Sequence, residues 1–83
     1  MATLFRHKYR DDKLVEIVEK ALNDDPTVHL SDLTINSRDG IVQLVGDARD
    51  SLSKRHAVES ARRAIERASL SYQRIDDEIR VKS

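Results

Sequence analysis

Cysteine and tryptophan are absent from this 83-residue chain, which has two glycines, one proline, two tyrosines and one phenylalanine. Without cysteine there is no disulfide, zinc–thiolate site or thiol nucleophile. The two glycines are not spaced as a phosphate-binding loop, and no apolar run approaches the ~20 residues of a membrane span. The chain is therefore expected to form one small domain with a thin core of Ile, Val, Leu and Ala.

Charge is balanced, with fifteen basic and fifteen acidic side chains. A net charge of zero gives no long-range field toward nucleic acid or an anionic membrane. The first ten residues are basic but contain no apolar segment, so they do not predict a signal peptide. We therefore expect a cytoplasmic protein if Met1 is the native start, or a periplasmic or envelope protein if this is a domain excised from a longer chain.

The periodicity of the chain changes from helix to strand at Pro26. Residues 1–10 lack periodicity and are expected to form a flexible basic tail. Asp11 or Asp12 is then expected to cap a helix that ends before Pro26. Its apolar stripe has helical spacing and consists of Leu14, Ile17, Val18, Ala21 and Leu22.

Three strands and a second helix follow. Alternating residues 33–36 predict a strand, Asp39-Gly40 predicts a hairpin turn, and residues 41–45 predict a central strand that Gly46 ends. Asp50 or Ser51 is expected to cap a helix whose inner face contains Leu52 and several alanines, and residues 75–81 predict the last strand. The expected order is α-β-β-α-β, as one α+β domain over residues 11–82.

No catalytic, cofactor or metal site can be assembled from these residues. The three histidines, His7, His29 and His56, have no i, i+4 partner. Asp76 and Asp77 are adjacent on a predicted strand and therefore point to opposite faces. Ser and Asp near the start of the second helix are typical capping residues rather than a triad.

Basic residues form the one binding signal. The second helix carries five of them, and three more lie in the tail beside Phe5 and Tyr9. Such residues can rest on anionic lipid at about 1 kcal/mol each, contact RNA phosphates, or simply be solvated. The candidate lipid- or partner-binding residues are Lys54, Arg55, Arg62, Arg63, Arg67, Arg6, Lys8 and Arg10.

Taken in order, several segments resemble the BON family (bacterial osmotic stress and nodulation). Residues 39–46, DGIVQLVG, with Ala48, Asp50, Lys54 and Ala57, are similar to its pattern D-G-x-V-x-L-x-G-x-V-x-S-x-x-x-K-x-x-A. Residues 75–81, IDDEIRV, are similar to its closing strand, and residues 21–26, ALNDDP, to the exit of its first helix. Ser71-Tyr72 stands where the family usually has Gly-Val.

The resemblance implies an αββαβ fold, a small three-stranded mixed sheet with two helices packed on one face. Asp39, Gly40 and Gly46 carry over as structural turn positions. It implies a non-catalytic, cofactor-free module that attaches to phospholipid surfaces or envelope components in bacterial stress responses. The alternative is a protein-interaction or oligomerisation module that uses a strand edge or the uncovered sheet face. RNA binding is less favoured, because the chain has no G-x-x-G loop and no net positive charge.

Overall fold

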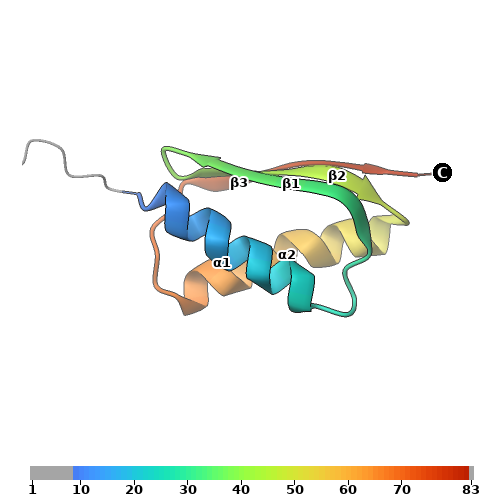
Figure 1. Ribbon diagram of the computed structural model, residues 1–83, viewed down its shortest axis with the longest axis horizontal. Coiled ribbons are helices and arrows are strands. Elements are labelled where there is room, and N and C mark those ends of the chain that lie inside the picture. Colours follow the sequence, from blue (N-terminus) through green and yellow to red (C-terminus); the bar gives the residue numbers. More distant parts are fainter. Residues whose placement is uncertain (1–8, 83) are drawn as a thin grey trace, which may run out of the picture.

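The computed structural model describes residues 9–82, which form two helices and three strands in the expected αββαβ order (Figure 1). Residues 1–8 of the predicted tail, including Arg6 and Lys8, lie outside the described residues. The elements are α1 (Asp11–Asp24), β1 (Leu30–Arg38), β2 (Ile41–Ala48), α2 (Ser51–Arg67) and β3 (Arg74–Val81). The sheet order is β1-β2-β3, antiparallel between β1 and β2 and parallel between β2 and β3. The predicted fold class is confirmed.

Both helices pack on one side of the sheet, and the other side is left uncovered (Figure 1). The core lies between these layers because alternate residues of β2 turn toward the helices. The alanines of α2 allow the helix to approach the sheet closely. The buried apolar residues are Leu14, Val18, Leu22, Val42, Leu44, Ala48, Ala57, Ala61, Ile65 and Ile79.

A two-residue turn, Asp39-Gly40, joins β1 to β2. Both residues have positive φ, 51° and 80°, as the hairpin turn that matches strand twist requires. Gly40 also lies against the ring of Tyr9, since a Cβ added there would be 2.5 Å from a ring carbon. Glycine is needed at this position for its conformation and for the space it leaves.

The prediction that Gly46 ends the second strand was wrong, because β2 continues to Ala48 and Gly46 pairs with Ile79. The glycine instead makes room for β1. Its missing Cβ would lie 3.1 Å from the Ser31 carbonyl oxygen, where β1 has a bulge between Ser31 and Thr34. A bulge bends its strand, and here the bend brings the β1 backbone close to β2.

The start of α1 also differs from expectation. Its N-cap residue is Arg10, which makes no side-chain capping bond, so neither Asp11 nor Asp12 is the cap. Asp11 is the first helical residue, and its carboxylate is directed away from the helix toward the β1–β2 turn. The start of α2, in contrast, has the predicted cap. Asp50 accepts a 2.8 Å hydrogen bond from the Ser53 amide, which lowers the pKa of the Asp50 carboxyl.

Leu52 was wrongly placed on the inner face of α2, since 56% of it is exposed. At about 100° per residue, the nine positions between Leu52 and the buried Ala61 put these two residues on opposite sides of the helix. The buried residues Ser53, Ala57, Ala61 and Ile65 define the face of α2 that packs on the sheet. Leu52 lies in the first turn but outside this face, so it is exposed although it is apolar.

Candidate functional site

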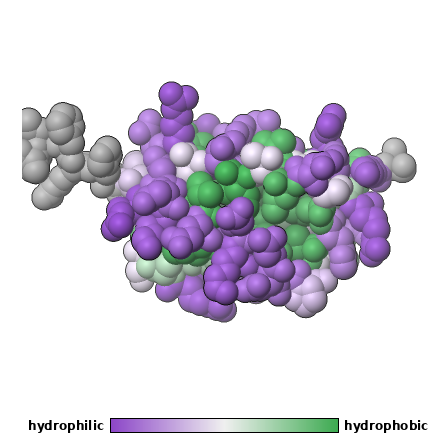
Figure 2. Space-filling view, in the orientation of Figure 1, coloured by the Kyte–Doolittle hydropathy of each residue, from purple (hydrophilic) through white to green (hydrophobic). Residues whose placement is uncertain are grey.

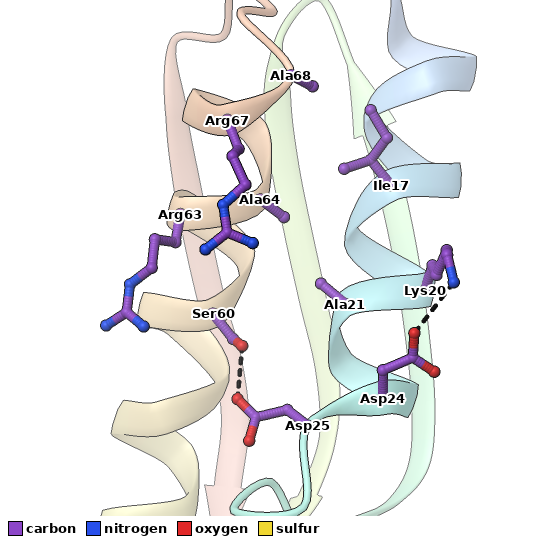
Figure 3. A pocket seen from close by; sticks show the side chains of 10 residues that line it. All are labelled: Ile17, Lys20, Ala21, Asp24, Asp25, Ser60, Arg63, Ala64, Arg67 and Ala68. Carbon is purple, nitrogen blue, oxygen red and sulfur yellow. Dashed lines mark hydrogen bonds and ion pairs between the residues drawn. The ribbon is translucent and has the colours of Figure 1, made fainter.

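A groove runs between α1 and α2 on the side of the domain away from the sheet (Figure 3). Its volume is about 520 Å³. Four apolar side chains line it, Ile17 and Ala21 from α1 and Ala64 and Ala68 from α2. These side chains were expected to be core, but each is partly exposed or exposed, whereas the fully buried α1 positions Leu14 and Val18 face the sheet.

Three basic side chains stand at the rim of this groove. Lys20 comes from α1, and Arg63 and Arg67 come from successive turns of α2 (Figure 3). Lys20 pairs with Asp24 at 3.1 Å and Arg63 with Glu59 at 3.9 Å, both in exposed positions where ion pairs are weak. Arg67 makes no ion pair with any residue in the range 9–82. The groove thus combines an apolar floor with three basic side chains, and the carboxylates of Asp24 and Asp25 also line it.

One end of the groove is closed by Asp25, just beyond α1. Its carboxylate accepts hydrogen bonds from Ser60 Oγ of α2 at 2.6 Å, and from Thr27 Oγ1 at 2.6 Å and the Thr27 amide at 2.9 Å. The Ser60 bond, followed by the Thr27 bonds, lowers the pKa of Asp25 from 3.8 to about 2. This carboxylate links the two helices and so holds the width of the groove.

The predicted basic residues of α2 do not form one surface. Lys54 faces β3, with its Nζ 3.9 Å from the Asp77 carboxylate. Arg55 and Arg62, seven residues apart, share a face of the helix, and about 100° separates Arg62 from Arg63. Only Arg63 and Arg67 border the groove. Arg10, the described basic residue of the tail, is exposed at the start of α1.

Lys20 was missed by the sequence analysis. It lies in a helix with an excess of acidic residues, and nothing in its local sequence marks it. The available signal was the spacing of small residues, Ala21 on one helix and Ala64 and Ala68 on the other. Two alanine-bearing faces opposite each other leave a groove where larger side chains would have filled it.

Chemically reactive groups do not converge in the described part of the chain. Residues 9–82 contain no group of three or more His, Asp or Glu side chains able to hold a metal ion. Asp76 pairs with Arg74 on the uncovered face, whereas Asp77 approaches Lys54 on the helix side, so the two carboxylates point apart. His56 Nδ1 is buried without a hydrogen-bond partner among these residues, but no nucleophile is hydrogen-bonded to it.

The chain is a small two-layer α+β domain with a groove between its two helices. The BON domain model matches residues 10–83, and the chain belongs to the BON family. BON domains are small, generally non-catalytic modules that are often linked to association with membranes and phospholipids. Comparison with curated proteins gives no significant match. Neither helix in residues 9–82 is long and apolar enough to cross a membrane.

Proposed function

We propose that this chain is a non-catalytic module that attaches to membrane surfaces bearing anionic phospholipids, through the α1–α2 groove. The observation that carries the proposal is the pairing of an apolar groove floor with the basic rim of Lys20, Arg63 and Arg67. The setting in the bacterial envelope and its osmotic stress response, known for the family, forms part of the same proposal.

The chemistry of the rim suits a lipid phosphate. An arginine guanidinium donates two parallel hydrogen bonds to a phosphate, and Arg63 and Arg67 project from successive turns of one helix face. The floor around Ile17 and Ala21 offers apolar contact to the first carbons below the headgroup. At about 1 kcal/mol per basic residue near an anionic surface, the attachment is expected to be weak, reversible and sensitive to salt.

Vesicle cosedimentation tests the proposal. The chain is mixed with phosphatidylglycerol/phosphatidylcholine vesicles or with pure phosphatidylcholine vesicles, at low and at high salt. We expect binding to the anionic vesicles at low salt only. The double variant Arg63→Glu/Arg67→Glu should abolish it.

The matched control is Arg55→Glu/Arg62→Glu, which makes the same charge change on the same helix but away from the groove. Far-ultraviolet circular dichroism checks that both variants are folded. Equal loss of binding in the two variants would show that only net charge matters, and binding to neither vesicle type would end the proposal.

A further inference from the structure

The two edges of the sheet have very different compositions. Five of the eight residues of β3 are charged, which is a common protection of an exposed edge against pairing with another chain. In β1, residues 33–37, Leu-Thr-Ile-Asn-Ser, carry no charge. Figure 1 looks onto this β1 edge, which lies in front of the other two strands.

The backbone of the β3 edge is also partly occupied. Lys82 donates its amide to the Ala48 carbonyl of β2, so alternation along a parallel strand turns the odd-numbered residues of β3 outward. Of these, the Ile79 amide donates to Asp77 Oδ1 at 3.1 Å. The same carboxylate is 3.9 Å from Lys54 Nζ. A strand added at this edge would have to displace Asp77.

The β1 edge has open backbone groups. Arg38 and Ile41 flank the two-residue turn and therefore form a hydrogen-bonded pair. Alternation then turns the amides and carbonyls of Ile35 and Ser37 away from β2. Within residues 9–82 no strand lies beyond β1 to meet these four groups.

An apolar seam lies beside this edge. Leu33 and Ile35 of β1 are partly exposed, and helical geometry puts the partly exposed Val15 on the flank of α1 that faces away from the groove. Figure 2 shows the seam as apolar surface along the junction of β1 and α1. The exposed acidic residues Asp12 and Glu19 lie on the same flank of α1 and form no ion pair within the described residues.

The two layers differ in width by about one strand. Three strands at ~4.8 Å spacing cover roughly 14 Å, whereas two helices of ~10 Å diameter cover roughly 20 Å. A fourth strand at β1 would therefore rest over α1. A second copy paired through the same edge would bring its own α1 against this one, and the acidic residues Asp12 and Glu19 of the two copies would face each other.

We propose that the β1 edge binds an extended segment of a partner protein by strand addition. The segment has alternating apolar residues that cover Leu33, Ile35 and Val15, and flanking Lys or Arg residues that face Asp12 and Glu19. It pairs with the outward backbone groups of Ile35 and Ser37. This site is separate from the groove and does not depend on lipid binding.

The test uses a synthetic peptide, Lys-Thr-Val-Thr-Val-Thr-Lys, titrated into the ¹⁵N-labelled chain. We expect the Ile35 and Ser37 amides to show the largest shifts and to gain protection from hydrogen exchange. Two further peptides carry N-methyl groups on one or the other alternate set of amides. Because an edge strand uses only one set, one of them should bind at least about tenfold more weakly and the other nearly normally.

Two matched variants locate the site on the chain. Ile35→Pro removes one outward amide at the β1 edge, and Ile75→Pro removes one at the β3 edge. Neither amide donates to a neighbouring strand of the sheet, so each variant keeps the strand pairing. Only Ile35→Pro should weaken the peptide. If a variant fails to fold, the methylated peptides still decide with the unaltered chain. Shifts centred on β3 or the groove, equal binding of both methylated peptides, or dimerisation of the free chain through Ile35 and Ser37 would overturn the proposal.

Discussion

At the start of α1 the Asp11 carboxylate reaches across to the β1–β2 turn, and just beyond its end the Asp25 carboxylate reaches across to α2. Asp11 accepts hydrogen bonds from Ser37 Oγ at 2.7 Å and from the Asp39 and Gly40 amides at 2.9 Å each. Asp25 accepts from two hydroxyls and one nearby amide. The first joins a helix to the sheet, and the second joins the two helices.

The donors at the two ends respond differently when the carboxylate is lost. The exposed Thr27 hydroxyl and the half-buried Ser60 hydroxyl can rotate toward another acceptor, whereas the turn amides of Asp39 and Gly40 have fixed directions, and Gly40 is buried. A fixed donor left without an acceptor carries the full desolvation penalty. The start of α1 should therefore contribute more to the stability of the fold, and the end of α1 more to the shape of the groove.

Asp11→Ala should have the largest effect, with a loss of roughly 2–3 kcal/mol in the free energy of unfolding, because three hydrogen bonds to one charged group disappear. Urea unfolding followed by circular dichroism measures it. Asp12→Ala is the matched control, since Asp12 is also in the first turn but exposed. It should cost only a few tenths of a kcal/mol through the helix dipole. If both variants lost the same free energy of unfolding, Asp11 would stabilise the fold through the helix dipole and not through its hydrogen bonds to the turn.

The sequence predicted that Asp11 or Asp12 caps α1, and neither does, although Asp11 holds the β1–β2 turn. Asp before an apolar helical stripe favours the N-cap, which is a local interaction. The actual partners lie up to 29 residues away. Element order, the Asp39-Gly40 turn and the Asp50 cap follow from neighbouring residues and could be predicted. The hydrogen bonds of Asp11 depend on the packing of α1 against the hairpin, which no local pattern contains.

The candidate site shows the same division. Basic residues on α2 were visible as a group, and their separation onto three sides of the helix follows from the helical period alone. Which of these sides borders the groove depends on the rotation of α2 against the sheet, which Ala57, Ala61 and Ile65 determine by packing. The contribution of α1 through Lys20 and Ile17 needs the α1–α2 contact as well. A groove made from two helices is a tertiary feature, and one helix sequence does not define it.

Ser60→Ala should have an intermediate effect, a loss of about 1 kcal/mol at neutral pH. The folded state lowers the pKa of Asp25 from 3.8 to about 2, so its contribution to stability is complete only well above pH 3.8 and is lost progressively as the pH falls through about 2. The variant removes the main cause of this shift. The pKa of Asp25 followed by NMR should therefore rise toward its usual value.

Measurement at acidic pH is the control for the comparison of Ser60→Ala with the unaltered chain. When the unfolding of both proteins is measured near pH 2, where the Asp25 carboxylate of the unaltered protein is about half protonated, the difference between them should shrink. If Ser60→Ala cost the same at neutral and at acidic pH, the hydroxyl would act through packing and not through its bond to Asp25. The same variant should leave the Asp11 end of α1 unaltered, as the Gly40 amide shift would show.

The C-terminal end of α2 differs from both ends of α1, because the hydrogen bonds that end it join backbone groups and involve no carboxylate. Ser69 donates its amide to the Glu66 carbonyl and Leu70 to the Ile65 carbonyl, a helix ending that places the residue after the cap in the left-handed region. Ser69 has φ 57° there, where glycine would be unstrained. Ser69→Gly should therefore stabilise the fold by about 0.5–1 kcal/mol in urea unfolding, the smallest effect and of opposite sign. A loss of stability would show that the Ser69 side chain, and not the backbone, holds this helix end.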